Sequence, residues 1–361
     1  MDRYAGITAL RVISAFNRRR QRPAAFRAIG ILASPTIGDT LLTSGAVGDL
    51  RRGFPDARLI YFTTPGASRA AAKLLHGIDE IQSIDILKPL LTIQTMRNCK
   101  LDLVVDFTQW QRITALYAGL SGAGYRLGFR SDGQHRHCLY DQTVSHSAEA
   151  HEIENFRALV RALGVEAESQ PALNVPNNQS LVDSGNVIFH PWASGDRSFL
   201  REWDRENWVA LAEKLARDET VFLITGTRAE LSRSEGLARR LRRAQLSAEP
   251  LLLRDGLGAL CGHIQRSELV VSVNTGIMHL AALLGARTIS LNGPTATHRW
   301  GPVGTKSCSV EPRGGGGGYL HFGFEFAGNP QDTMQRICVE DVFAAAQELL
   351  PRLQQSVTAK T

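Results

Sequence analysis

A short turn in the second half of the chain has the residue types of an anion-binding site. The stretch 268–285 consists of an apolar segment typical of a strand, a turn at Asn274, Thr275 and Gly276, and an apolar segment that predicts a helix. The first N–H groups of a helix have no intrahelical acceptor, and they lie at the positive end of the helix dipole. Such a turn suits a phosphate held beyond the carboxyl end of a strand.

The side chains of this turn add further donors. Gly276 permits close approach of a ligand, Thr275 offers a hydroxyl, and His279, one turn into the helix, can donate to a phosphoryl oxygen. The same residues also fit an ordinary helix start, with Asn274 or Thr275 as the cap and His279 as a surface side chain. Taken alone, the turn supports either interpretation.

A second turn, in the first half of the chain, offers a carboxylate instead. Residues 34–43, SPTIGDTLLT, follow the first apolar segment and place Asp39 in the first turn of a predicted helix. An aspartate there commonly complements the helix dipole or caps the helix. At the carboxyl end of a sheet it can also take a proton from an incoming hydroxyl. The first half of the chain thus offers a candidate base, and the second half offers hydrogen-bond donors for an anion.

The elements that carry these turns follow an α/β pattern, in which short apolar segments alternate with amphipathic helices. Segments rich in Ile, Val and Leu without polar alternation are typical of parallel sheets covered on both faces. The first half predicts strands at 27–33, 58–63, 81–87, 101–107 and 125–129, and helices at 39–53 and 151–163. The second half predicts strands at 187–190, 221–225, 250–253, 269–273 and 288–291, and a closing helix from 339 to about 353.

The length of the chain, 361 residues, exceeds what one core of at most about 250–300 residues organises, so we expect two domains. Residues 171–185 have neither helical nor strand periodicity and contain two prolines and a polar run, as a linker does. We therefore divide the chain into a basic amphipathic segment (1–26), a first Rossmann-like domain (27–170), the linker (171–185), a second Rossmann-like domain (186–338) and a C-terminal helix and tail (339–361).

The formal net charge of +6 is concentrated at one end, because the first 30 residues hold seven arginines and one aspartate. The rest of the chain is formally neutral, which argues against a nucleic-acid-binding protein. Ile7, Leu10, Ile13 and Phe16 recur beside the arginines, and on a helix they make an apolar stripe flanked by cations, as in helices that lie on anionic lipid. A solvated basic extension is the alternative.

Other site types find little support in the sequence. The five cysteines are widely spaced and contain no CxxC pair, which favours a reducing cytoplasm over a disulfide framework or a thiolate metal site. No DxD pair or cluster of carboxylates and histidines suggests a bound metal ion, and no GxGxxG motif suggests a dehydrogenase. No apolar run is long enough for a membrane span, and no leader peptide is evident.

Five segments taken together resemble glycosyltransferase family 9, the heptosyltransferases of lipopolysaccharide core assembly. Their order and spacing agree with the family from about Arg27 to about Leu350. They are SPTIGDTLLTSGAVGDLRRGFPDARL, FHPWASGDRSFLREWDRENWVALAEKL, LITGTRAE, VNTGIMHLAALLGARTISLNGPT and RWGPVG.

The resemblance implies a GT-B fold, in which two Rossmann-like doubly wound domains face across a cleft, the first holding the acceptor and the second the nucleotide sugar. It implies an inverting, metal-independent transfer of heptose from ADP-heptose to a saccharide or anionic glycolipid of the bacterial envelope, with no cofactor besides the ADP-sugar donor. A cytoplasmic enzyme is expected, with possible contact to the inner face of the membrane through residues 1–26.

The resemblance also implies roles for individual residues. Asp39 matches the catalytic base, and Arg201 matches a basic residue that neutralises the leaving diphosphate, for which a guanidinium fork is suited. The candidate acceptor contacts are chosen from the sequence and not from the resemblance: they are Arg126 and Arg130, at the end of a strand expected to face the cleft. The candidate nucleotide-sugar contacts are Ser194, Gly226, Glu230, Asn274, Thr275, Gly276, Met278 and His279.

One departure from the family bears on the donor, since Asn274 stands where the family usually has aspartate. Asparagine donates as well as accepts hydrogen bonds and has no charge, so the sugar identity is open. The same fold with another nucleotide sugar or a protein acceptor is one alternative. A non-catalytic nucleotide-sugar-binding protein is another.

Overall fold

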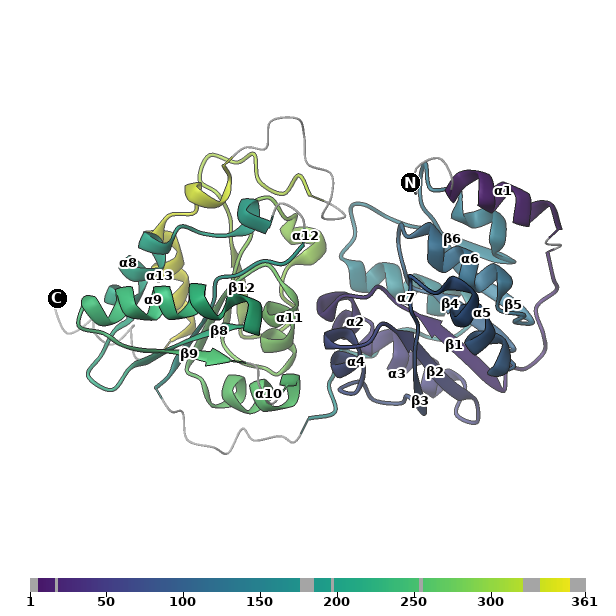
Figure 1. The fold of residues 1–361 in the computed structure, drawn as a ribbon, viewed down its shortest axis with the longest axis horizontal. Helices are drawn as coiled ribbons and strands as arrows, with labels where there is room; N and C mark the ends of the chain where they lie inside the picture. The colour runs from purple at the N-terminus through teal and green to yellow at the C-terminus, as the bar shows by residue number, and fades with distance from the viewer. Residues whose placement is uncertain are drawn as a thin grey trace. The chain divides into compact units, whose positions relative to one another are not determined.

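The computed structural model describes residues 6–16, 19–175, 185–195, 198–252, 256–320 and 332–350. The chain divides into two compact units, Met1–Asn174 and Val175–Thr361. The division falls inside the interval 171–185, of which 176–184 lie outside the described residues. Each unit contains a six-stranded sheet with its own helices, and within each sheet all neighbouring strands are parallel (Figure 1).

The first sheet has the order β3-β2-β1-β4-β5-β6. Its strands are β1 (Ala28–Leu32), β2 (Arg58–Thr63), β3 (Glu80–Ser83), β4 (Leu103–Asp106), β5 (Tyr125–Arg130) and β6 (Gln142–Ser145). Its helices are α1 (Ile7–Phe16), α2 (Ile37–Leu42), α3 (Ser44–Gly53), α4 (Ala67–Ala72), α5 (Pro89–Asn98), α6 (Arg112–Leu120), the short 3₁₀ helix η2 (Arg136–Leu139) and α7 (Glu152–Ala162).

The second sheet has the order β12-β11-β10-β7-β8-β9. Its strands are β7 (Val187–His190), β8 (Val221–Gly226), β9 (Ser247–Leu252), β10 (Leu269–Val273), β11 (Thr288–Leu291) and β12 (Ser307–Val310). Its helices are η3 (Ser198–Arg201), α8 (Arg205–Leu215), η4 (Arg228–Glu230), α9 (Leu231–Arg243), α10 (Gly256–Arg266), α11 (Gly276–Leu283), α12 (Thr297–Trp300), η5 (Met334–Arg336) and α13 (Val339–Leu349).

The two sheets have the same doubly wound topology, which confirms the predicted pair of Rossmann-like units. In each, the first strand of the unit lies beside the fourth, β1 beside β4 and β7 beside β10, and the chain winds outward from that pair in both directions. Ligands of open α/β sheets bind beyond the carboxyl ends of the strands at this switch point. We therefore expect ligand-binding residues in the loops after β1 and β4, and in the loops after β7 and β10.

Both central strands of the second unit are buried along their whole length, which explains why their sequences, VIFH and LVVSV, are almost entirely apolar. On one side of the sheet, Trp208 of α8 packs against Phe189 of β7, with ring centroids 4.8 Å apart. Helix α13 packs beside α8 through Val342 and Ala346, which are both fully buried in the same core. The closing helix is therefore part of the second unit, and it ends at Leu349 rather than near residue 353.

The sequence missed one strand of each sheet, and both are edge strands. β6 is only partly buried, and β12 has a single buried residue, so neither has the apolar run that reveals a central strand. The predicted helix 39–53 is two helices, because Thr43 ends α2 and begins α3. The strand predicted at 81–87 ends at Ser83, and the strand predicted at 250–253 begins at Ser247.

The basic N-terminal segment is not a solvated extension over residues 7–16, which form α1. Leu10 is fully buried in the core of the first unit, and Ile13 packs against the same cluster. Farther along, side chains of Arg20 and Arg22 donate to the carbonyl oxygens of Ala123 and Leu163. Two residues of the apolar stripe, Leu10 and Ile13, therefore pack on the first unit. Residues 1–5 and 17–18 lie outside the described residues, as does the side chain of Phe16. Within the described part of the chain, no helix combines the length and apolarity that a membrane crossing requires.

Candidate functional site

The switch point of the second sheet gathers most of the predicted nucleotide-sugar contacts. β7 and β10 are hydrogen-bonded neighbours, with His190 opposite Ser272 at their carboxyl ends. The loop after β7 carries Ser194 and Arg201, and the turn after β10 carries residues 274–279. Residues that are about 80 positions apart in the sequence thus follow adjacent strand ends.

The amino end of α11 has an unused hydroxyl. Thr275 is the N-cap with an extended backbone (φ −149°, ψ 175°), yet its side chain makes no capping bond. Its Oγ1 is buried and has no hydrogen-bond partner. The first bond of the helix runs from the His279 N–H to the Thr275 carbonyl, at 3.3 Å, so the N–H groups of residues 276–278 have no intrahelical acceptor. Hydroxyl and amides together suit an anionic oxygen.

The neighbouring residues hold this turn in place. Asn274 donates through Nδ2 to the carbonyl oxygen of Trp300 at 2.7 Å, a bond that the aspartate usual in the family has no N–H to make. Met278 is fully buried and His279 is only 3% exposed, so the interpretation of His279 as a surface side chain is wrong. The turn is anchored on α12 on one side and in the core on the other.

Arg201 folds back onto the loop that precedes it. Its Nη2 donates to the carbonyl oxygen of Ser194, while its Nε is buried without a partner. Gly195 has φ +90°, and a Cβ at this position would lie 3.7 Å from Arg201 Nη2. Burial lowers the pKa of the Arg201 guanidinium, and Glu202 partly offsets this. A partly desolvated guanidinium is well suited to gain from a bound anion.

Three residues that the sequence did not single out fix the same loop. Glu202 accepts through Oε1 from the Ala193 N–H at 3.1 Å and from Arg233 Nη1 at 3.2 Å. The Arg233 guanidinium lies over the Trp192 ring, 4.1 Å from its centroid. Because Arg233 belongs to α9, 31 positions after Glu202, no local pattern in the sequence links the two.

Gly226 and Glu230 lie at the carboxyl end of β8, next to β7. A Cβ at Gly226 would lie 2.7 Å from Ser234 Oγ, so close packing demands a glycine there. Glu230 accepts the Thr227 N–H through Oε2 at 2.7 Å, and the Thr227 side chain accepts the Glu230 N–H, which together form a capping box. Thr227 Oγ1 also donates to Glu230 Oε2 at 2.9 Å. In this structure, Gly226 serves packing and Glu230 caps a helix; their predicted contacts with a nucleotide stay predictions.

His190, at the end of β7, should make the stability of the protein depend on pH. Burial lowers its pKa from 6.5 to about 4, with Glu230 opposing slightly, and Nδ1 bonds Thr225 Oγ1 at 2.7 Å. Below pH 6.5 the unfolded chain binds a proton here that the native protein does not, so the free energy of unfolding falls as the pH drops toward 4, by up to about 1.4 kcal/mol per pH unit. His190→Asn should flatten this fall in urea titrations between pH 6.5 and 4; equal slopes in both proteins would contradict it.

In the first unit, Asp39 lies in the first turn of α2, directly beyond the carboxyl end of β1. Thr36 caps this helix by accepting the Asp39 N–H at 3.1 Å. The Asp39 side chain is partly exposed, and its charge adds to the burial that raises the pKa of Tyr61. The carboxylate therefore stands at the switch point of the first sheet, where the sequence predicts it.

A buried ionic network shapes the other loops at this edge. Asp106, the last residue of β4, accepts through Oδ2 from Arg136 Nη2 at 2.8 Å and from the Tyr140 hydroxyl at 2.7 Å. Both charged side chains are fully buried. From the loop after β4, Gln111 Nε2 donates to Ser34 Oγ at 3.4 Å, which ties this loop to the segment before Asp39.

Arg126 does not lie at the carboxyl end of its strand, where it was expected. It is the second residue of β5, near the amino end, and it is 2% exposed. Its Nε and Nη2 donate to the Asp141 carboxylate at 2.8 and 2.7 Å. Arg130, the last residue of β5, is exposed at the carboxyl end, about 13 Å farther along the strand. The prediction that both arginines reach the ligand edge is therefore wrong for Arg126.

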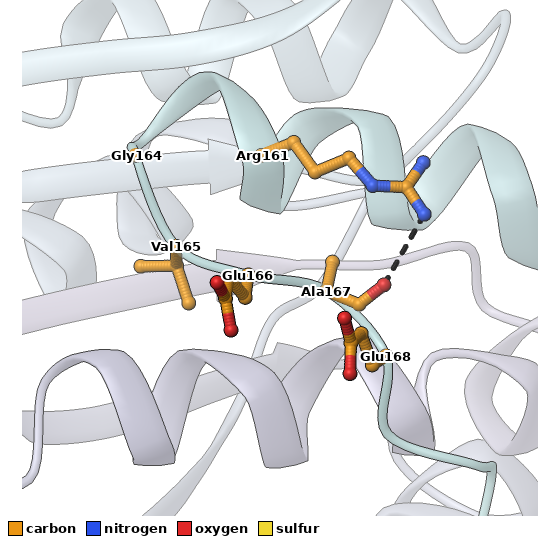
Figure 2. A pocket seen from close by; sticks show the side chains of 6 residues that line it. All are labelled: Arg161, Gly164, Val165, Glu166, Ala167 and Glu168. Carbon is orange, nitrogen blue, oxygen red and sulfur yellow. Dashed lines mark hydrogen bonds between the residues drawn. The ribbon is translucent and has the colours of Figure 1, made fainter.

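A hollow of about 320 Å³ lies elsewhere, where α7 ends (Figure 2). Arg161 lines it and donates through Nη2 to the carbonyl oxygen of Ala167 at 3.2 Å. Because α7 starts after the carboxyl end of β6 and runs back, its end lies at the opposite edge from Asp39, and Glu166 and Glu168 line the hollow. It therefore does not fit an anionic nucleotide. Among the described residues, no three His, Cys, Asp or Glu side chains gather as metal ligands; metal independence stays a prediction.

Comparisons with known proteins agree with the fold and the resemblance. The family model described as glycosyltransferase family 9 (heptosyltransferase) matches residues 91–312. Lipopolysaccharide heptosyltransferase 3 of Escherichia coli is 26% identical over 292 residues, which cover 73% of this chain and 83% of that protein.

Two solved structures share the architecture of both units. E. coli ADP-heptose lipopolysaccharide heptosyltransferase II has a TM-score of 0.72 at 17% identity, covering 91% of this chain and 99% of that one. E. coli heptosyltransferase WaaC with ADP has a TM-score of 0.70 at 18% identity, covering 89% and 99%. These likenesses confirm the GT-B fold. Since the family model covers more than half of the chain, the protein belongs to glycosyltransferase family 9 and is a glycosyltransferase.

Proposed function

We propose that this protein transfers heptose from ADP-heptose to a saccharide of the bacterial envelope, of the lipopolysaccharide-core type, with inversion at the anomeric carbon and without a metal ion. The names of its relatives support the sugar and the acceptor class, since one is a lipopolysaccharide heptosyltransferase and a structural neighbour is a heptosyltransferase with ADP. The observation that carries the proposal is the unpartnered Thr275 hydroxyl at the amino end of α11, beside the Arg201 loop.

On the donor side, the bond between the anomeric carbon and the diphosphate oxygen breaks, and its electron pair stays on the diphosphate. The N–H groups at the start of α11 and Thr275 Oγ1 donate to the phosphate oxygens, and Arg201 and His279 stabilise the charge that develops. Donors that are already in place need no reorganisation during the reaction, and such preorganisation is often the largest catalytic contribution. Ser194 and Glu230 are proposed to contact the nucleoside.

On the acceptor side, Asp39 takes the proton of the attacking hydroxyl. The hydroxyl oxygen forms its bond to the anomeric carbon on the face opposite the leaving diphosphate, which inverts the configuration. Arg130, exposed at the same edge, is the remaining candidate for an anionic group of the acceptor. Arg126 leaves the set, because Asp141 holds it at the other end of β5.

The proposed location is the cytoplasm. All five cysteines are free, and Cys99 and Cys261 are buried, which is in keeping with a reducing compartment. Contact of α1 with the inner face of the membrane is not part of this proposal, because Leu10 and Ile13 of the apolar stripe that suggested it pack in the core of the first unit.

A donor screen tests the proposal. Purified protein is melted with ADP-heptose and with UDP-, GDP- and CMP-sugars at matched concentrations. A ligand at 100 times its Kd stabilises the native state by about 2.7 kcal/mol, so the true donor gives a clear rise in Tm. We expect the rise with ADP-heptose. A rise with another nucleotide sugar, and none with the ADP compound, would reject the heptose donor.

Thr275→Val is the sharpest variant for the donor site. Because the Thr275 hydroxyl has no partner in the free protein, valine should leave Tm unchanged or slightly higher. The bond to a charged phosphate oxygen is lost, so the Kd for ADP should rise about tenfold or more in isothermal titration. Thr297→Val, which also removes a buried hydroxyl without a partner, is the matched control and should keep the wild-type Kd. Equal affinities of wild type and Thr275→Val would place the diphosphate elsewhere.

A further inference from the structure

Exposed aliphatic side chains gather in one short turn of the first unit. Six large apolar residues are exposed in the described part of the chain, and four of them lie within residues 86–91. They are Ile86 (44% exposed), Leu87 (89%), Leu90 (82%) and Leu91 (55%). We call residues 86–91, with the sequence ILKPLL, the apolar turn.

The apolar turn is held in shape by hydrogen bonds at its base. Asp85 accepts the Leu87 N–H through Oδ1 at 2.9 Å and the Lys88 N–H through its carbonyl oxygen at 3.1 Å. Thr92, 1% exposed, accepts the Asp85 N–H and donates to the Asp85 carbonyl oxygen, both at 3.0 Å. Pro89 starts α5, a position for which its fixed φ is preorganised. The leucines are therefore exposed in a turn whose backbone is fixed by hydrogen bonds, and not in a frayed segment.

The turn lies at the same sheet edge as the proposed acceptor site. It follows the carboxyl end of β3, and β3 is separated from β1 only by β2, with Leu32, Phe62 and Gln82 in register. Two strand spacings amount to about 10 Å. Asp39, which follows β1, and the apolar turn, which follows β3, thus belong to one edge of the first unit.

We propose that the apolar turn inserts into the lipid surface in which a glycolipid acceptor is anchored. This inference rests on the proposed function and deepens it, because it makes the acceptor lipid-bound: the saccharide reaches Asp39 while the turn rests on the lipid beside it. Leucine side chains that are almost wholly exposed project outward, and a fluid hydrocarbon layer can surround them without a matching cavity. Lys88, whose side chain is 68% exposed, forms an ion pair with Asp85 at 3.7 Å, and its aliphatic stem lets the ammonium group exchange this exposed and weak pair for contact with the headgroups.

A protein partner fits this turn less well. The residues that dominate protein interfaces are Trp, Tyr and Arg, with leucine under-represented, and the apolar turn contains none of the three. A stable complex buries about 800 Å² on each side, over some 20–30 residues, whereas the turn is a projection of six. The turn is likewise too small to hold a second copy of this chain in a stable dimer.

The test uses vesicles, with no nucleotide or acceptor present. Wild type, the double variant Leu87→Ser/Leu90→Ser, and Val12→Ser are sedimented with phosphatidylcholine vesicles containing a fraction of phosphatidylglycerol. Val12 is the matched control, since it is an aliphatic residue 55% exposed on α1, the other candidate membrane contact. We expect wild type and Val12→Ser to bind alike. Because inserting a leucine side chain is worth tenfold or more in partitioning, the double variant should bind about 100-fold more weakly.

Thermal melting and transfer to a lipid-free acceptor show whether the variants are folded and active. All three proteins should melt alike, because the replaced side chains are exposed, and all should transfer sugar equally to a lipid-free oligosaccharide. Equal vesicle binding by wild type and the double variant, or no binding by wild type, would overturn the inference. A loss confined to Val12→Ser would assign the contact to α1, and a change in molar mass of the double variant would assign the turn to a second copy. Vesicle binding with no transfer to any acceptor would leave the apolar turn standing and refute the proposed function instead.

Discussion

Asp39→Asn is expected to lower kcat by about 10²- to 10⁴-fold, the range attributed to a positioned general base. The amide has the shape of the carboxylate but cannot take the proton of the acceptor hydroxyl. Thr36 caps α2 through the backbone N–H of residue 39, which asparagine retains, so the fold should not change. The Kd for the donor should stay at the wild-type value, because the proposed nucleotide contacts all belong to the second unit.

The control for this variant is Asp56→Asn. Asp56 is an exposed aspartate just before the amino end of β2, at the opposite edge of the same sheet. It should keep the wild-type kcat in a coupled assay of ADP release. Full activity of Asp39→Asn would exclude the carboxylate as the base. If neither wild type nor variant transfers sugar although both bind the donor, the proposed transfer to this class of acceptor would be refuted.

Arg201→Ala should have the second largest effect, a loss of about 10²- to 10³-fold in kcat, comparable to removing one preorganised donor from a developing charge. Arg201→Lys should recover only part of it, since the ammonium keeps the charge but not the planar fork. Arg205→Ala, at the exposed start of α8, is the matched control and should act like wild type. Steady-state kinetics with varied donor give kcat and KM for each.

The split between kcat and KM separates two roles for Arg201. In this structure its guanidinium also ties Arg201 to the carbonyl oxygen of Ser194. If it only holds the loop, Arg201→Ala should raise the donor KM and leave kcat near the wild-type value. If the guanidinium stabilises the charge that develops on the leaving diphosphate, Arg201→Ala should lower kcat and change KM little. We expect the second pattern.

Much of the fold could be predicted from the sequence, because central strands of a parallel sheet are buried on both faces and appear as continuous apolar runs. The bounds predicted for β7, β10 and β11 match the structure. β6, whose residues Gln142, Thr143, Val144 and Ser145 are at most partly buried, carries no such signal. The strand predicted at 81–87 was too long, because the apolar residues after β3 look like a continuation of a buried strand. Ile86 and Leu87 are in fact exposed, and β3 ends at Ser83.

The site could be predicted only where its residues are local in sequence. Asp39 and Thr275 each follow a strand within a few positions, so a motif can indicate them. The pairing of Arg136 with Asp106 spans 30 positions and depends on the fold, and no local pattern reveals it. Arg126 failed in a different way, because the strand predicted at 125–129 already placed it near the amino end, and Asp141, 15 positions later, holds it there.

The most direct test of inverting, metal-independent heptosyl transfer is acceptor-dependent release of ADP from ADP-heptose in the presence of EDTA, with a heptose-deficient lipopolysaccharide core oligosaccharide as acceptor. ³¹P NMR follows the release of ADP, and ¹H NMR gives the anomeric configuration of the product. We expect ADP to appear only when acceptor is added, and the new glycosidic bond to have the anomeric configuration opposite to that of the donor. Asp39→Asn should slow the release of ADP by about 10²- to 10⁴-fold. ADP release that requires an added metal ion, or a product that retains the donor's configuration, would contradict this mechanism.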